Sequence, residues 1–211
     1  MKKIRKKYLG LFIVLAFLGI GLSGCILWDN ATLTFTEYAK GLPLTISTYT
    51  AQGKKIDEIK TNKAYIHTDR TMSETDKDSN QLSKVIDIDY GNHRTTHVGS
   101  SMIAYSGLTN YVDKLNHAKV NTRNEEINDN SIPWLSSIYK DFKNSWSGRD
   151  SVLLIRSQQG VPIATFVGHS ISLHKTDMKS VTKFIIDKKP VFVYRCDYST
   201  YDVDTIKKMS E

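Results

Sequence analysis

Two histidines, four residues apart, are the first side chains in this chain whose spacing could support chemistry. His93 and His97 follow the turn-forming pair Gly91-Asn92. In an extended strand both imidazoles lie on one face, where they could ligate a metal ion together with a third residue. The sequence offers no recognisable third ligand. We therefore interpret them as surface or hydrogen-bonded histidines, with a metal site as the alternative.

A second pattern, Asp76-Lys-Asp78-Ser-Asn80, has the alternating carboxylate and amide spacing of a calcium-binding loop. Asp87 stands where such a loop places its final acidic ligand. However, Gln81 occupies the position that requires glycine, and no helices are expected on either side. We interpret the segment as a solvated polar loop, with calcium at Asp76 and Asp78 as the alternative.

Cys196 is one of two cysteines in the chain. It lies in the segment 191–197, whose alternating side chains predict a strand. Free cysteine is among the most buried residue types, so we expect a buried core thiol. The alternative is a nucleophile paired with a histidine, although no local catalytic signature surrounds the residue.

Several short motifs imitate functional signatures but lack their context. Ser137 and Ser180 each precede a lysine by three residues, as in penicillin-recognising enzymes, but chance predicts about two such pairs in this composition. Gly168-His-Ser170 lacks the second glycine of a nucleophile elbow. Gly19-x-Gly21-x-x-Gly24 lacks the flanking strand and helix of a dinucleotide site. We assign no chemistry to these motifs.

The second cysteine, Cys25, ends a segment that resembles a bacterial lipoprotein signal. Residues 2–7 carry five lysine or arginine residues, and no charge occurs from Tyr8 to Leu22. The sequence Leu22-Ser-Gly-Cys25 then resembles a site that is cut before the cysteine, whose sulfur receives a diacylglycerol. Two acyl chains suffice for stable anchoring. We therefore predict lipidation at Cys25 and attachment to the membrane through that diacylglycerol.

The alternative for the same segment is an uncleaved transmembrane helix. The uncharged span from Tyr8 to Trp28 reaches the length of about 20 residues that crosses a bilayer. In both interpretations the N-terminal lysines stay cytoplasmic and the residues after Cys25 face outward. We expect a signal peptide at 1–24, a lipid anchor with a short linker at 25–30, and a single extracytoplasmic domain at 31–211.

The charge balance changes once this segment is set aside. The formal charge of the chain is +7, but the five charged residues of the signal are all basic, so the remainder carries only +2. This value gives no support to nucleic-acid binding. With Cys25 lipidated, Cys196 is the one thiol left, and no intramolecular disulfide can form.

The tether behind Cys25 is short. Ile26–Asn30 are the residues that precede the alternating segment 31–36, and six extended residues reach at most about 20 Å. We therefore expect the folded domain to lie close to the membrane, with Trp28 as an interfacial anchor.

Alternating apolar and polar residues predict a chain dominated by strands. Several neighbouring strands are separated by glycine-containing or charged turns, which predicts hairpins. Polar residues at 70–83 predict a loop. The expected strands are 31–36, 44–49, 54–60, 63–68, 85–90, 97–105, 151–156, 162–167, 171–173, 184–186 and 191–194.

The clearest helix runs from Ile132 to Trp146, where apolar residues recur at three- and four-residue spacing on one face. Ser131 is the expected cap, and Gly148 the expected stop. A shorter helix is expected within 108–118. Together these elements predict an α+β fold that is β-rich, with a mostly antiparallel sheet and one main amphipathic helix.

The last third of the chain has a local excess of basic residues. We interpret the excess as a solvated strand face with lysines at hairpin tips, as is usual for edge strands. The alternative is contact with anionic lipid headgroups or a cell-wall polyanion. The basic residues are Lys175, Lys179, Lys183, Lys188, Lys189 and Arg195.

Several segments resemble a family of surface lipoproteins of Gram-positive bacteria, known as a domain of unknown function. The resemblance implies a surface lipoprotein in a Gram-positive membrane, with no assigned catalytic residue, cofactor or metal. It covers most of the chain after the signal. The segments that carry it are Leu44-Thr-Ile, Ile56-Asp-Glu-Ile, His97-Val-Gly-Ser-Ser, Ser151-Val-Leu-Leu-Ile-Arg-Ser-Gln-Gln-Gly and Val193-Tyr-Arg-Cys-Asp-Tyr.

These observations predict a binding or accessory lipoprotein at the outer face of the cytoplasmic membrane. Its expected partners are the membrane, through the diacylglycerol on Cys25, and either a protein or an envelope polyanion, but not nucleic acid. The alternative is a cell-envelope hydrolase or metal-dependent enzyme built around His93, His97 or Cys196. A convergent polar pocket would favour the enzyme, whereas an exposed apolar patch would favour binding.

Overall fold

The structure is a computed structural model. It divides the chain into two units, Met1–Leu33 and Thr34–Glu211, and every residue described below belongs to the second. Cys25, Trp28 and the expected strand 31–36 lie outside the described residues, as do Asp76 and Asp78. The described residues are 43–69, 71–72, 74–75, 81–82, 84–119, 131–176 and 178–210.

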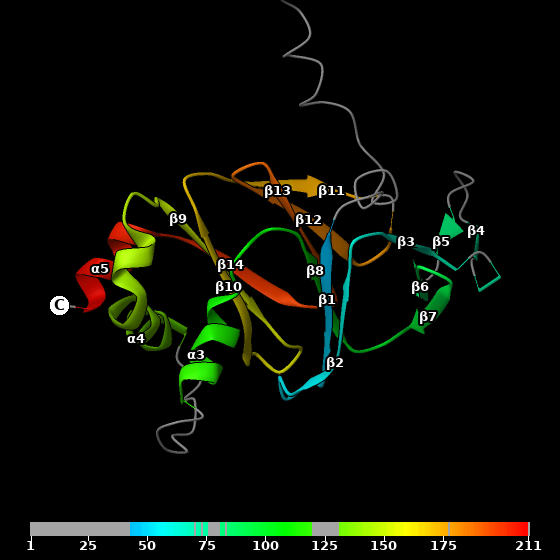
Figure 1. Cartoon of the computed structure of the whole chain (residues 1–211), viewed down its shortest axis with the longest axis horizontal. Helices are drawn as coiled ribbons and strands as arrows, with labels where there is room; N and C mark the ends of the chain where they lie inside the picture. Colours follow the sequence, from blue (N-terminus) through cyan, green and yellow to red (C-terminus); the bar gives the residue numbers. More distant parts are fainter. Residues whose placement is uncertain are drawn as a thin grey trace, which may run out of the picture. The chain divides into compact units, whose positions relative to one another are not determined.

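The centre of the fold is a six-stranded antiparallel sheet (Figure 1) with the order β11-β12-β13-β8-β1-β2. Its inner strands are buried on both faces because their side chains alternate between two apolar clusters. In β8, for example, Met102 and Ala104 join one cluster, while Ile103 and Tyr105 join the other. The strands are β1 (Leu44–Tyr49), β2 (Lys55–Thr61), β8 (Ser101–Tyr105), β11 (Ile171–Lys175), β12 (Val181–Ile186) and β13 (Lys189–Tyr194).

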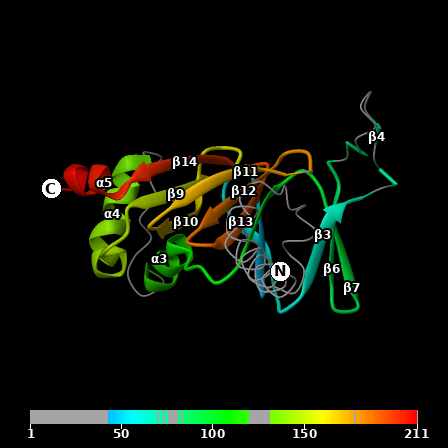
Figure 2. The ribbon, with the colours of Figure 1, turned by 90° about the horizontal axis from the view of Figure 1, so that it is seen from above.

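A smaller sheet packs against each face of this central sheet, as the opposite sides of Figure 2 show. The first has the order β10-β9-β14 and contributes Leu153, Ile155 and Phe166 to the shared core. The second has the order β3-β6-β7 and contributes Ile66 and Ile88. Their strands are β9 (Ser151–Arg156), β10 (Pro162–Gly168), β14 (Asp197–Asp202), β3 (Ala64–Thr68), β6 (Ile86–Tyr90) and β7 (His93–His97).

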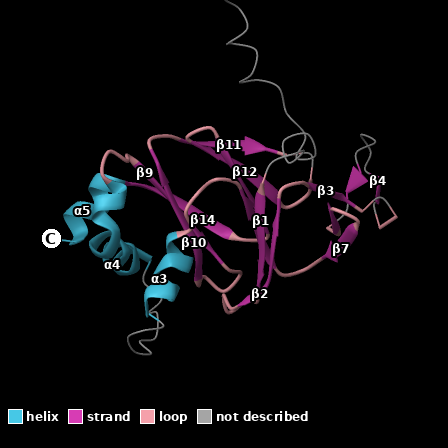
Figure 3. Ribbon diagram, in the orientation of Figure 1, coloured by secondary structure: helices cyan, strands magenta, loops and turns pink. Residues whose placement is uncertain are grey.

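The helices gather at one end of this unit, as Figure 3 shows in cyan. They cover the outer face of the β10-β9-β14 sheet. There Val152 and Leu154 point away from the core that this sheet shares with the central sheet, and they pack with Leu135 and Ile138. Among the described residues, none of the helices is long and apolar enough to cross a membrane. The elements are α3 (Tyr111–Lys119), α4 (Ser131–Phe142), the 3-10 helix η1 (Lys143–Trp146) and α5 (Val203–Ser210).

The predicted fold class is confirmed. The pairings among the described strands are antiparallel, and the longest of the described helices is α4. The predicted hairpins are confirmed at β1–β2, β9–β10 and β12–β13. The polar segment 70–83 is not purely a loop, because it contains the paired short strands β4 (Glu74–Thr75) and β5 (Gln81–Leu82).

One predicted strand is wrong in its extent. The segment 97–105 does not form one strand: β7 ends at His97, the chain bends, and β8 starts in another sheet at Ser101. Gly99 makes this bend at a φ of +91°, which glycine adopts without steric cost. The predicted strand 191–194 is confirmed within β13, but the alternation towards Cys196 does not continue the strand, because β13 ends at Tyr194 and Arg195 turns the chain at a φ of +50°.

The main helix also differs from the prediction at both ends. Ser131 is the first residue of α4 rather than the cap before it. The α-helix ends at Phe142, and the last predicted turn is the 3-10 helix η1, since 3-10 turns commonly tighten helix ends. Gly148 follows at a φ of +68°, as expected for a stop.

Candidate functional site

The two histidines of the predicted metal pair lie on one face of β7, as the strand register requires. His97 donates from Nε2 to the carbonyl oxygen of Ser100 at 3.0 Å, and its ring packs edge-on against Tyr194. His93 lies against the ring of Tyr90. Within the described ranges, no group of three histidine, cysteine or acidic side chains is placed to hold a metal ion.

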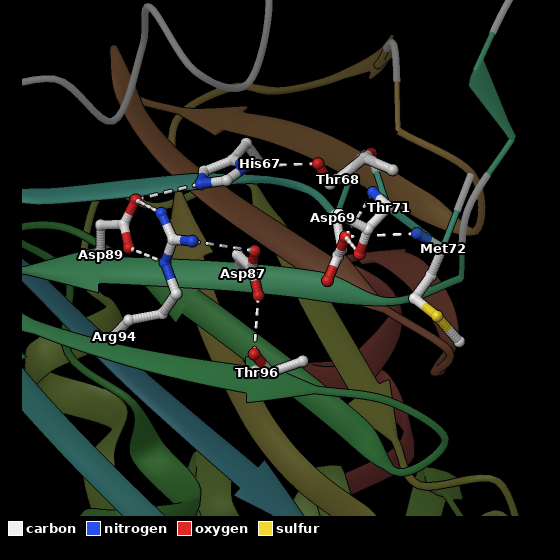
Figure 4. Close-up of polar contacts among 9 residues, drawn as sticks. All are labelled: His67, Thr68, Asp69, Thr71, Met72, Asp87, Asp89, Arg94 and Thr96. Carbon is white, nitrogen blue, oxygen red and sulfur yellow. Dashed lines mark hydrogen bonds and ion pairs between the residues drawn. The ribbon is translucent and has the colours of Figure 1, made fainter.

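Asp87, the expected last ligand of the calcium pattern, belongs to a polar cluster on the β3-β6-β7 sheet (Figure 4). Its side chain is almost fully buried, and one of its carboxylate oxygens accepts a hydrogen bond from Thr96 Oγ1 at 2.7 Å. Arg94 Nη1 lies 3.7 Å from its other oxygen. Asp87 is therefore engaged within the sheet.

Arg94 is the centre of the same cluster. It donates from Nε and Nη2 to the two carboxylate oxygens of Asp89, at 2.5 and 2.9 Å (Figure 4). His67 Nε2 lies 3.0 Å from Asp89 Oδ2. The hydrogen bonds from Arg94, with a smaller contribution from His67, lower the pKa of Asp89 to about 2. Because these groups hydrogen-bond to one another, we interpret the cluster as a structural link between the three strands β3, β6 and β7.

Acidic pH is expected to weaken the polar cluster around Arg94 and the ion pairs of Glu58 on β2. Glu58 accepts hydrogen bonds from Lys55 and Lys60, which lower its pKa to about 2. A carboxylate with a lowered folded-state pKa stabilises the fold above its unfolded pKa of about 4, and this contribution is lost as pH falls towards 2. We expect Asp89 and Glu58 together to contribute about 1–2 kcal/mol after solvent screening.

Urea unfolding at pH 7, 4 and 3 measures this loss. The Arg94→Gln variant is the control, since its stability should fall less steeply between pH 4 and pH 3 than that of the wild type. Parallel pH profiles for the two proteins would contradict the assignment to Asp89.

Cys196 does not have the properties of a nucleophile. It is half-buried against the core, and its Sγ donates to the carbonyl oxygen of Tyr194 at 3.2 Å. Burial raises the pKa of the thiol to about 12, so the thiol stays protonated at neutral pH. A reactive cysteine needs the thiolate, which this environment disfavours.

A serine and a histidine do meet on the edge strand β11. Ser172 Oγ lies 2.9 Å from His174 Nε2, and both side chains lie towards solvent. No described acidic residue is paired with His174 in a hydrogen bond or an ion pair. A catalytic pair requires an oriented base and a place for the reacting atom. We assign no reaction to them.

The predicted basic segment of the last third is not uniformly solvated. Lys183 on β12 is 4% exposed, and burial lowers its pKa. Lys188 and Lys189, in contrast, are exposed at the β12–β13 hairpin. The basic segment therefore reaches the surface at Lys175, at Lys179 and at this hairpin, but not at Lys183.

That hairpin borders a cleft of about 580 Å³. The loop between β8 and α3 forms another side, with Leu108 and the first residue of α3, Tyr111. Arg149 enters from the segment between η1 and β9, and His169 from the β10–β11 loop. Segments far apart in the sequence therefore converge on one cavity, as expected of a ligand site.

Asp187 holds the cationic side of the cleft together. Its Oδ1 accepts hydrogen bonds from the backbone N–H groups of His169 at 2.9 Å and Ser170 at 3.1 Å. Its Oδ2 accepts from Arg149 Nη1 at 2.6 Å. A Cβ atom at Gly168 would lie 3.1 Å from the same carboxylate and only 2.5 Å from Ile186 Cγ2, so glycine permits this close approach. One carboxylate thus fixes both the loop and the guanidinium.

The lining carries more positive than negative charge. Arg149, Lys188 and Lys189 face one carboxylate, that of Asp187. Lys189 Nζ also donates to the carbonyl oxygen of Gly107 at 2.6 Å, across the cleft wall. Such an arrangement can bind an anion through hydrogen bonds and charge.

The hairpin turn itself is strained. Asp187 and Lys188 are the two central residues of the β12–β13 turn, with φ values of +47° and +66°. Type I′ turns need positive φ at both positions, and Asn-Gly is the favoured pair. A lysine in this conformation is a backbone outlier at the cleft, where strain is commonly kept for a functional side chain.

We expect Lys188→Gly to stabilise the fold by about 0.5–1 kcal/mol while weakening anion binding. Glycine relieves the strain at positive φ, and the cleft loses one cation. Thermal unfolding and an anion titration of the same variant measure the two effects. A Lys188→Gln variant separates them, since it loses the charge but keeps the strain. Reduced stability of Lys188→Gly would contradict this account.

Comparison with known proteins gives one match. Residues 6–206 match the family described as Domain of unknown function (DUF5052). The chain belongs to the DUF5052 family. No curated protein and no solved structure matches the chain. The predicted membership of a domain-of-unknown-function family is therefore confirmed, while lipidation and a Gram-positive source stay predictions.

For this DUF5052 protein, the sequence pattern indicates part of the cleft but not its centre. The basic segment includes the lysines of the hairpin, whereas no motif marks Arg149. The signal that could have indicated Arg149 is the pair Gly148-Arg149, which lies between the main helix and a buried strand. A charged residue directly after a turn-forming glycine is expected in a surface loop, where binding residues are common. The pairing of Arg149 with Asp187 depends on tertiary structure.

Proposed function

We propose that this DUF5052 protein is a lipid-anchored binding module at the outer face of the cytoplasmic membrane, and that its basic cleft holds an anionic group of the cell envelope. The observation that carries the proposal is the gathering of Arg149, Lys188 and Lys189 around a solvent-accessible cavity with one carboxylate. Bacterial envelopes present anionic groups at the membrane surface, and each nearby lysine or arginine contributes about 1 kcal/mol to such contacts.

The lipid anchor is supported by the sequence around Cys25. The order of a basic segment, an uncharged apolar segment and Leu-Ser-Gly-Cys is that of a lipoprotein signal. The short linker expected at 25–30 would keep the domain close to the bilayer, because six extended residues reach at most about 20 Å. At this distance from the bilayer, an anion-binding cleft can contact anionic groups at the membrane surface.

Binding fits the chemistry of the cleft better than hydrolysis. Its lining residue His169 approaches Asp150, with Nδ1 3.7 Å from Oδ2, but both side chains are largely exposed. Among the described lining residues, no serine or threonine hydroxyl is hydrogen-bonded to this histidine. Arg149, Lys188 and Lys189 are placed to hold an anion, whereas the described lining residues include no general base that is oriented on a nucleophile.

Membrane anchoring is tested by replacing each cysteine in turn. In a bacterial host that processes lipoproteins, the wild type should incorporate labelled fatty acid and sediment with membranes. The Cys25→Ala variant should lack the label and keep its signal segment. Cys196→Ser is the matched control and should behave as the wild type. If Cys25→Ala still fractionates with membranes and migrates as the processed form, lipidation is wrong.

Anion binding is tested with the processed protein and isolated envelope material. The doubly substituted Lys188→Gln/Lys189→Gln protein should sediment with the material several-fold less than the wild type, and added salt should reduce wild-type binding. The control is Lys54→Gln/Lys208→Gln, which removes the same charge from exposed positions away from the cleft. Equal losses in both double variants would contradict a role for the cleft.

A further inference from the structure

We propose that the anionic group held by the cleft is a phosphate ester of a polyol or sugar, and that Arg149 is its principal ligand. This inference rests on the proposed function and specifies its ligand. It follows from the free edge of one guanidinium, the charge of the lining and the size of the cleft.

A guanidinium has two edges that can bind an oxyanion through two parallel hydrogen bonds. One edge consists of Nε and Nη2, and the other of Nη1 and Nη2. In Arg149, Nη1 is committed to Asp187 Oδ2 at 2.6 Å. Among the described residues, no acceptor is paired with Nε or Nη2 of Arg149. The edge formed by Nε and Nη2 is therefore available, and about a third of the side chain is exposed.

The same chain shows how an oxyanion occupies this edge. Arg94 uses its Nε and Nη2 to bind both oxygens of Asp89, at 2.5 and 2.9 Å (Figure 4). Arg149 presents the equivalent pair of donors in a cleft. Since Asp187 also binds the loop at His169 and Ser170, the guanidinium is held in place before a ligand arrives. Such preorganisation lowers the entropic cost of binding.

The charge of the lining favours phosphate over carboxylate. Three cationic side chains and one carboxylate leave two unit charges to be neutralised. A phosphate monoester carries about −1.5 to −2 at neutral pH, whereas a carboxylate carries only one negative charge. Phosphate also offers three acceptor oxygens, enough for the Arg149 edge and for a lysine on the hairpin.

The cleft is larger than a phosphate ion needs. Its volume of about 580 Å³ lies in the range of small-molecule sites. Beside the cations it offers the apolar side chains of Leu108 and Val167, the ring of Tyr111, and the hydroxyl groups of Thr109 and Ser170. Hydroxyls next to apolar and aromatic surface suit the carbon skeleton and hydroxyl groups of a polyol or sugar.

The test compares glycerol 3-phosphate with glycerate, which has a similar carbon skeleton but a carboxylate. With the processed protein, calorimetric titration should show that glycerol 3-phosphate binds about tenfold more tightly than glycerate. Arg149→Lys, which keeps the charge but loses the two-donor edge, should weaken that binding about tenfold. Arg94→Lys is the matched control and should leave the affinity unchanged, because its edge is occupied by Asp89.

Phosphatidylglycerol and phosphatidylcholine vesicles extend the same comparison to a lipid source. Arg149-dependent binding to the phosphatidylglycerol vesicles alone supports a lipid headgroup, and Arg149-dependent binding to soluble glycerol 3-phosphate supports a free ester. Equal affinity for glycerate, or an Arg149→Lys variant that binds as the wild type, would overturn this inference and leave the proposed anion site intact. Failure of the wild type to bind any of these anions would overturn both.

Discussion

Trp146→Ala is expected to lower the free energy of unfolding by about 3–5 kcal/mol, the range for large-to-small changes of buried aromatic residues. Trp146 is 1% exposed and ends η1 between the helices and the β10-β9-β14 sheet. The rings of Tyr111 and Tyr139 pack edge-on against it, at centroid distances of 5.6 and 5.7 Å. Alanine would leave a cavity where three rings meet. Urea unfolding of purified protein measures the loss.

Trp146→Phe is the control for this variant. The indole N–H of Trp146 is buried without an acceptor among the described residues, so phenylalanine removes an unsatisfied donor while keeping an aromatic ring. We expect it to cost only about 1–2 kcal/mol. If both variants lost the same stability, the packing account of the helical end would be wrong.

The second large effect is expected at Asp187. Asp187→Ala removes three hydrogen bonds and leaves the N–H groups of His169 and Ser170 and the guanidinium of Arg149 without their acceptor. We expect a loss of about 2–4 kcal/mol in the free energy of unfolding. Thermal and urea unfolding measure this value. A variant as stable as the wild type would contradict the role of Asp187 as the anchor of the loop.

Asp187→Asn separates positioning from charge at the cleft. The amide oxygen can still accept from the two backbone N–H groups, so stability should fall less than in the alanine variant. Arg149 loses its acceptor, because the amide nitrogen is a donor. In a purely electrostatic cleft, removal of a negative charge would tighten anion binding. We expect weaker binding of glycerol 3-phosphate, because the guanidinium is no longer held in place.

The strands were predictable because alternation marks a strand buried on one face and a continuous apolar run marks a strand buried on both. Leu44–Ser47 alternate apolar and polar residues, whereas Val152–Ile155 form a continuous apolar run, and the partners of both strands follow within short hairpins. The division of 97–105 into two strands was not predictable from alternation, because polar residues near Gly99 fit a strand and a bend equally well. Residues 197–202 form β14 although their outer side chains are polar, since pairing with the buried β9 decides their conformation.

The candidate site was less accessible to sequence reasoning than the fold. Lys188 and Lys189 could be placed at a hairpin tip, because local pattern predicts a turn there. Arg149 could not be placed beside Asp187, since 38 residues separate them and the two are brought together by tertiary packing, in which β10 shares a core cluster with β12 and β13. The predicted ligands failed for a related reason. His97 and Asp87 found partners within the protein, which a spacing rule does not reveal.

Binding of an anionic envelope group in the cleft between the β12–β13 hairpin and the β8–α3 loop can be followed residue by residue. Isotopically labelled, processed protein is titrated with glycerol 3-phosphate and observed by two-dimensional NMR. We expect saturable shifts of the Arg149 Nε–H signal and of the backbone amides of His169, Ser170, Lys188 and Lys189. Shifts confined to the β3-β6-β7 sheet, or no saturable shifts at these five residues, would contradict binding in this cleft.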